Sequence, residues 1–135
     1  MRSYHPGVVL VLLVLFCPAK PAQAQTNVSS VVGIWRGQGH QSPAGSTGSE
    51  WSILMTIQKG GGSIEYPSLG CGGTLTEISN SGASAQFREH ITHMGKSGCV
   101  DGGLITVNLS KGKLAWAWTG TDHGTVYNAV ANLAR

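Results

Sequence analysis

The stretch GSIEYPSLGCGGTLTEI (residues 62–78) decides the fold, because it places a Tyr-Pro turn and a Gly-Cys-Gly-Gly cluster between two strand-like runs. Apolar and polar residues alternate on both sides of the turn, which is the period of a half-buried strand. Glycine and proline between such runs mark a turn. The stretch therefore predicts two β-strands joined by a short connection, with a cysteine beside it.

The same pattern continues from residue 31 onward, and no segment has apolar residues at the i, i+3, i+4 spacing of a helix. Strands are predicted over residues 31–38, 50–58, 62–66, 73–78, 84–92, 104–109, 113–119 and 124–133. Eight short strands favour an all-β, antiparallel up-and-down barrel, with a two-sheet β-sandwich as the alternative. Two polar segments are predicted as loops, QGHQSPAGSTGS (38–49) and GKSGCVDGG (95–103), and the first as a mobile loop at one mouth of the barrel.

The N-terminus has the three parts of a secretory signal peptide: Arg2, the apolar run VVLVLLVLF (8–16) and a small-x-small ending, AQA (22–24). The apolar run is too short to span a bilayer, which takes about 20 residues. Cleavage is predicted after Ala24, so that residues 1–24 are the signal peptide, 25–30 a flexible lead-in and 31–135 a single domain. We therefore expect a secreted or periplasmic protein without a membrane anchor.

Two of the three cysteines, Cys71 and Cys99, are left once residues 1–24 are removed. Two cysteines in an oxidising compartment predict a disulfide, which should stabilise the fold by about 3 to 4 kcal/mol. A reactive cysteine is the alternative, but it would need a partner histidine and independence from the other cysteine.

The processed chain is nearly neutral, because loss of Arg2 and Lys20 leaves seven Lys and Arg against six Asp and Glu, a net charge of +1. Its cations are spread singly along the sequence, whereas nucleic-acid binding needs a basic patch. No nucleic-acid partner is expected.

Glu89 is the unusual residue of the strand predicted over 84–92, because the two-residue period puts it on the same face as Phe87 and Ile91. A buried carboxylate needs a partner or takes a raised pKa. Glu89 is therefore a structural carboxylate bonded to an Arg, a Trp N–H or the backbone, a ligand-binding group, or a general acid or base. No second carboxylate at a defined spacing supports catalysis.

Four tryptophans are many for a domain of this size. In a small barrel they fill the interior or line a cavity for a small apolar ligand, and an exposed contact surface is a further alternative. The candidate ligand-binding residues are Glu89, Trp35, Trp51, Tyr66, Trp116 and Trp118.

The segment REHITHM (88–94) has His90 and His93 close to Glu89. A zinc motif needs its two histidines one helical turn apart, whereas on a strand positions three apart point to opposite faces. The glycine-rich GGGS (60–63) lacks the lysine and the following helix of a phosphate loop. We therefore expect neither a metal nor another cofactor.

Five motifs follow one another along the chain: GIWRGQG (33–39), IEYPSLGCGGTL (64–75), FREHI (87–91), GCVDGGLITV (98–107) and LAWAW (114–118). Together they resemble a small secreted bacterial β-barrel domain of unknown function that is also appended to bacterial signalling proteins such as serine/threonine kinases. The resemblance covers nearly all of the chain after residue 24 and carries no catalytic residue across. The opening Gly33-Ile34-Trp35 also resembles lipocalin- and avidin-like (calycin) barrels, which implies a calycin-like fold but no biotin site.

These patterns favour a noncatalytic binding module that holds a small ligand or a secreted protein partner at the barrel mouth or its loops, and inhibition of a hydrolase is one form of that role. One alternative is a small secreted hydrolase that uses Glu89 with His90 or His93, and another is a stress-related envelope protein with a purely structural role. No G-x-S-x-G nucleophile elbow occurs in the sequence.

Overall fold

The structure, a computed structural model of the chain, describes residues 18–19, 30–45, 48–95 and 98–135. Apart from Pro18, Ala19 and Ser30, the predicted signal peptide (1–24) and lead-in (25–30) lie outside the described residues, so both stay predictions. In the described part of the chain, no helix is long and apolar enough to cross a membrane.

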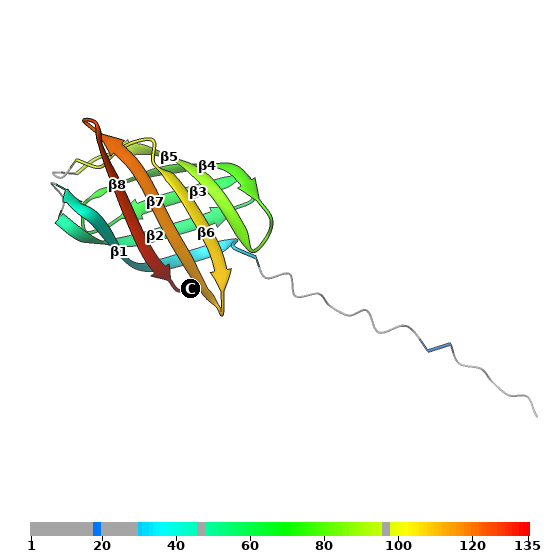
Figure 1. Cartoon of the computed structure of the whole chain (residues 1–135). Helices are drawn as coiled ribbons and strands as arrows, with labels where there is room; N and C mark the ends of the chain where they lie inside the picture. The colour runs from blue at the N-terminus through cyan, green and yellow to red at the C-terminus, as the bar shows by residue number, and fades with distance from the viewer. Residues whose placement is uncertain (1–17, 20–29, 46–47, 96–97) are drawn as a thin grey trace, which may run out of the picture.

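Eight antiparallel strands make up the domain (Figure 1): β1 Gly33–Gly45, β2 Gly48–Gln58, β3 Gly61–Tyr66, β4 Cys71–Asn80, β5 Ser84–His93, β6 Leu104–Ser110, β7 Lys113–Asp122 and β8 Thr125–Leu133. Each strand pairs with its neighbours in sequence, and β1 also pairs with β8, so the sheet closes into a barrel. The predicted up-and-down barrel is confirmed, and the two-sheet sandwich is wrong. Closure also gives the first and last strands hydrogen-bond partners that an open sheet would lack.

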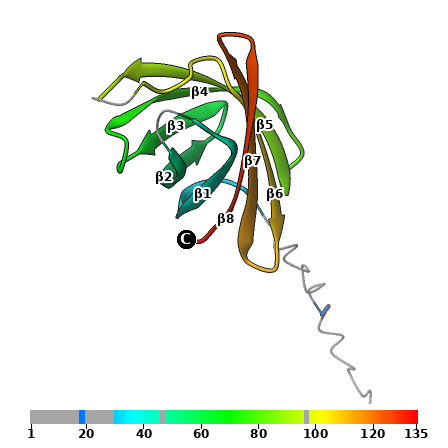
Figure 2. The ribbon, with the colours of Figure 1, turned by 60° about the vertical axis from the view of Figure 1, so that its left-hand side comes forward.

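Tight turns impose the antiparallel order. Lys111 and Gly112 connect β6 to β7, and His123 and Gly124 connect β7 to β8; all four residues have positive φ, at 51°, 74°, 46° and 81°. Two successive positive φ values define a type I′ turn, whose twist matches that of the strands it joins. Viewed after a 60° turn, the β7–β8 turn lies at one end of the barrel and the C-terminus at the other (Figure 2). We call the end with the β7–β8 turn the mouth.

Side chains that alternate along each strand fill the interior. Most of the positions predicted to face the core are buried, namely Trp51, Ile53, Met55, Ile57, Ala85, Phe87, Glu89, Ile91, Ile105, Val107, Leu114, Trp116, Trp118, Ala129, Ala131 and Leu133. Leu109 and Tyr127, also predicted there, are only partly buried and pack against this core. Glu89 is the one charged side chain that is buried in the described residues.

The loop predicted over residues 38–49 is wrong over most of its length. β1 continues to Gly45, and β2 begins at Gly48. The reason is barrel closure: residues 40–42 of β1 pair with residues 128–130 of β8, which satisfies the backbone groups of a segment whose polar composition favours a loop. A similar extension takes β7 three residues past its predicted end, to Asp122.

A bulge between β4 and β5 corrects a second prediction. Gly73 lies opposite Ile91 while Gly72 lies opposite His93, so Thr92 is the extra residue of the bulge. The bulge shifts the alternation of β5, and His90 and His93 are both exposed rather than on opposite faces.

Candidate functional site

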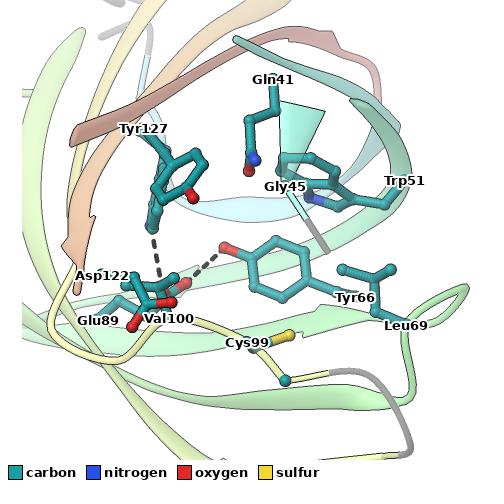
Figure 3. A pocket seen from close by; sticks show the side chains of 12 residues that line it. Gln41, Gly45, Trp51, Tyr66, Leu69, Glu89, Cys99, Val100, Asp122 and Tyr127 are labelled. Atoms are coloured by element: carbon teal, nitrogen blue, oxygen red, sulfur yellow. Dashed lines mark hydrogen bonds between the residues drawn. The ribbon is translucent and has the colours of Figure 1, made fainter. Parts of the chain in front are cut away.

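The mouth holds a cavity of about 60 Å³ (Figure 3). Its wall is notable for four aromatic rings and two carboxylates, contributed by Trp51, Tyr66, Glu89, Trp118, Asp122 and Tyr127. These residues come from β2, β3, β5, β7 and β8, and all of them lie near the strand ends that meet at the mouth. The cavity thus gathers side chains from widely separated parts of the sequence.

Glu89 is the central polar group of this cavity. Its side chain points inward, and only 1% of the residue is exposed. Trp118 Nε1–H donates a hydrogen bond to Oε1 at 3.1 Å. The Tyr66 hydroxyl donates to Oε2 (Figure 3). Both carboxylate oxygens therefore have a partner, which offsets part of the cost of burial.

The environment of Glu89 shifts its acidity. The pKa of Glu89 is raised from 4.5 to about 7 as the net result of several causes: burial raises it most, the hydrogen bonds from Tyr66 and Trp118 lower it, and the charge of Asp101 raises it. Burial also raises the pKa of Tyr66 well above its ordinary value, and the nearby Glu89 adds to that rise. Tyr66 therefore stays a neutral donor while Glu89 titrates near neutral pH.

Residues 98–103 of the loop before β6 hold Glu89 in place. Pairing of β5 with β6 stops at Arg88, and beyond it the Glu89 N–H donates to the Gly103 carbonyl at 2.9 Å. Ile91 N–H donates to Asp101 Oδ1 at 2.8 Å, and this bond is the main cause of a lowered pKa of Asp101. The loop thus replaces β6 as the hydrogen-bond partner of β5 at the mouth.

A disulfide between Cys71 and Cys99 fastens the same loop to the start of β4, with a Cα–Cα distance of 6.5 Å. The predicted pairing is confirmed. Cys71 is fully buried, whereas Cys99 and the following Val100 line the cavity. The Gly-Cys-Gly-Gly cluster therefore serves the framework, and the described residues at the mouth include no free thiol.

Two glycines make room for the indole of Trp118. A Cβ atom at Gly103 would stand 2.0 Å from Trp118 Nε1, and one at Gly120 would stand 2.6 Å from its outer ring carbons. Neither distance is possible for a real side chain, so the hydrogen bond from Trp118 to Glu89 depends on glycine at these positions.

Trp51 forms the opposite wall. Its ring meets that of Tyr66 edge to face, with centroids 6.4 Å apart and planes at 83°. Trp51 is 5% exposed, and its Nε1–H has no hydrogen-bond partner in the described part of the protein. A buried N–H usually finds an acceptor; this one lies beside Gly39 of β1, where an added Cβ atom would stand 3.3 Å from it.

The other two candidate tryptophans lie elsewhere. Trp35 is near the start of β1, away from the mouth, where its Nε1–H donates to the Val31 carbonyl at 2.8 Å and the Arg135 guanidinium lies 4.4 Å from its ring centroid. Trp116 is buried in the barrel interior and does not line the mouth cavity. Both residues fill the core.

The histidines do not join Glu89. His90 Nδ1 lies 3.2 Å from Asp101 Oδ1, and His93 Nε2 lies 2.9 Å from Glu65 Oε2, both on the outer surface. No group of three or more His, Cys, Asp or Glu side chains able to hold a metal occurs among the residues that the structure describes.

Sequence reasoning missed Asp122 as a residue of the cavity and took Tyr127 only as part of the core. Both flank the His123-Gly124 turn, so extending β7 to this turn would have carried them to the mouth. It also missed Asp101, for which no sequence signal exists, since its role depends on the free edge of β5.

No protein-family model matches the chain, and neither a curated protein nor a solved structure shows significant similarity to it.

Proposed function

We propose that this chain is a secreted or periplasmic, noncatalytic binding module that holds a small ligand, or one side chain of a secreted protein partner, in the mouth cavity. The observation that carries the proposal is Glu89, a buried carboxylate fixed by two donors in the wall of an aromatic cavity. Aromatic walls with a few convergent polar groups are typical of ligand sites. Binding to a secreted hydrolase as an inhibitor is one form of this function.

The bonds that anchor the loop before β6 support a binding role. The disulfide and the hydrogen bonds to Gly103 and Asp101 hold the loop that covers one side of the cavity. A site that is ordered before its ligand arrives loses less entropy on binding. The disulfide also supports an oxidising compartment, in agreement with the signal peptide expected from the sequence.

The hydrolase alternative has one observation in its favour, the pKa of Glu89 near neutrality, which suits a general acid or base. Glu89 faces the interior, however, while His90 and His93 face outward and pair with other carboxylates. A hydrolase that uses these residues together would need a different arrangement of β5, so binding is the better-supported function.

The test is an indole N–H NMR titration of the ¹⁵N-labelled protein with small amines, alcohols, carboxylic acids and sugars. At least one class should shift the Trp51 and Trp118 signals and leave Trp35, at the far end, unchanged. Native mass spectrometry of the protein exported by a bacterial host, compared with the denatured sample, reports any ligand carried through purification. No shift at the mouth with any class, together with equal native and denatured masses, would contradict a binding function. Turnover of a substrate that is lost in Glu89→Gln with the fold intact would favour the enzyme.

A further inference from the structure

The mouth cavity has a clear electrostatic bias. Two of its lining residues, Glu89 and Asp122, are carboxylates, and none of its lining residues in the described ranges is Lys, Arg or His. Tyr66, the nearest acidic neighbour of Glu89, has a pKa raised by burial and stays neutral. The cavity therefore offers negative charge without a positive partner from its own wall.

The aromatic rings add to the same preference. The face of an indole or phenol ring carries partial negative charge and attracts cations, and tryptophan does so most strongly. An anion in this cavity would meet two carboxylates and leave its own charge unpaired, which is costly in a buried site. A cation would gain from Glu89 and from each ring whose face it contacts.

Each carboxylate oxygen of Glu89 can accept one more hydrogen bond. Among the described residues, each of its oxygens takes a single hydrogen bond, from Trp118 on Oε1 and from Tyr66 on Oε2. A carboxylate oxygen has two acceptor sites, so one on each oxygen is unused. An ammonium group carries three donors and can use these sites.

The size of the cavity limits the ligand. A volume of about 60 Å³ holds roughly four to six atoms of the size of water. This suits a narrow group such as the unbranched alkyl chain of a lysine side chain better than a sugar ring.

We propose that the mouth cavity binds a primary alkylammonium group, with the charge against Glu89 and the alkyl chain along the aromatic wall. The inference deepens the proposed function, because it names the ligand of the same cavity. The group can come from a free small amine or from a lysine side chain of a protein partner.

Binding of a cation favours the charged form of Glu89, so affinity should rise with pH as Glu89 loses its proton. The titratable groups around Glu89 are Tyr66 on β3, Asp122 on β7, Tyr127 on β8 and Asp101 in the loop before β6. Two exposed histidines pair with these carboxylates: His123 Nε2 lies 3.6 Å from Asp122 Oδ1, and His90 Nδ1 lies 3.2 Å from Asp101 Oδ1. Asp101, whose pKa is lowered, adds a constant negative charge across the pH range in which Glu89 loses its proton.

The experiment compares n-butylammonium with n-butanol and butyrate, which are of similar length but neutral and negative. Each is titrated into the exported, disulfide-bonded protein while the four tryptophan indole signals are followed. n-Butylammonium should shift Trp51 and Trp118 but not Trp35, and its Kd should be lower than those of the other two probes by at least about tenfold. Its affinity should increase between about pH 5 and about pH 8.

Three variants test which carboxylate contacts the ammonium group. Glu89→Gln should raise the Kd of n-butylammonium by about tenfold and change that of n-butanol little. Asp122→Asn, at a half-exposed position that does not endanger folding, should raise it by about two- to threefold. Glu50→Gln removes the same charge from the outer surface, where Glu50 is 60% exposed, and should leave the Kd unchanged.

The outcomes separate the two proposals. Binding of n-butanol or butyrate at Trp51 and Trp118 as tight as that of n-butylammonium would overturn the choice of a cation and leave the binding function standing. If none of the three probes shifts these signals, the proposal of an alkylammonium ligand is also wrong. The titration with the other ligand classes and the comparison of native and denatured masses then decide separately whether the cavity binds a ligand. Tighter binding of Nα-acetyl-lysine-N-methylamide than of n-butylammonium would identify a protein side chain as the source, and the reverse order a free amine.

Discussion

Tyr66 and Glu89 are hydrogen-bonded in the mouth cavity although 23 residues separate them in the sequence. The phenol on β3 donates to the carboxylate on β5, and both side chains are buried. Because the pKa of Tyr66 is raised well above its ordinary value, Glu89 is the group of this pair that changes charge near neutral pH. The stability of the barrel should therefore respond to the ionisation of Glu89.

Stability should fall as the pH rises through the range in which Glu89 titrates. The pKa of Glu89 is about 7 in the folded protein against an ordinary value of 4.5, so the folded state holds the proton more tightly. Below the ordinary pKa, Glu89 is neutral in both the folded and the unfolded protein, so its ionisation does not affect stability. As the pH rises further, the unfolded protein loses this proton first, and the free energy of unfolding falls until the pH passes the pKa of Glu89 in the folded protein. Between these limits the wild type should lose about 3 kcal/mol of unfolding free energy relative to Glu89→Gln.

Urea unfolding of both proteins from about pH 4 to about pH 8 measures this difference, and the comparison cancels the titration of all other groups. Parallel pH profiles for the two proteins would show that Glu89 has no raised pKa.

Tyr66→Phe removes one of the two donors to Glu89 and leaves the ring in place. A hydrogen bond to a charged group contributes about 1.5 to 3 kcal/mol, so the loss should be largest near pH 8, where Glu89 is ionised, and smaller near pH 5. The pKa of Glu89 should also rise further above about 7, because the Tyr66 hydrogen bond lowers it. Carboxyl ¹³C NMR of Glu89 follows that change.

Tyr127→Phe is the matched control, since Tyr127 lines the same cavity and has no hydrogen bond to Glu89 in the structure. It should change stability by less than about 0.5 kcal/mol. Equal losses in the two variants would mean that the Tyr66 hydroxyl has no special role.

Gly103→Ala should displace the Trp118 indole, because the added methyl group would stand 2.0 Å from Trp118 Nε1. Overpacking of this kind costs about 1 to 3 kcal/mol. The Trp118 indole N–H signal should move as its hydrogen bond to Glu89 is lost.

Gly98→Ala tests the same change in the same loop, at a glycine with open space around it and no positive φ. It should have a small effect on both stability and the Trp118 signal. An unaltered Trp118 signal in Gly103→Ala would show that the indole is not confined by residue 103.

Removal of the disulfide in Cys71→Ala/Cys99→Ala should lower the unfolding free energy by about 3 to 4 kcal/mol, because the bond closes a loop of 28 residues in the unfolded chain. Hydrogen exchange should speed up where β5 is bonded to the loop before β6, above all at Ile91 N–H of β5, which donates to Asp101 in that loop. Peptide mapping of the wild type without reductant should recover the two cysteine peptides linked, and free thiols at both positions would contradict the pairing.

Much of the fold could be predicted because local pattern and short turns agree. The two-residue alternation put Glu89, Trp51 and Trp118 on the inner face, and barrel closure kept them there. Strand ends were less predictable: the polar continuation of β1 to Gly45 has no local preference for a strand and forms one because β8 lies beside it. The site was predicted only as a set of candidates, of which the structure brings Trp51, Tyr66, Glu89 and Trp118 together.

The sequence by itself determined that the chain makes short alternating strands, which side of each strand is apolar, and that two cysteines are available to pair, because these depend on neighbours within a few residues. Only the tertiary structure decided which inward side chains meet at one end. Trp35 and Trp118 have the same kind of position on their strands, yet one donates to the Val31 carbonyl and the other to Glu89. Strand direction and register fix that difference, and they arise from pairing between distant segments of the chain.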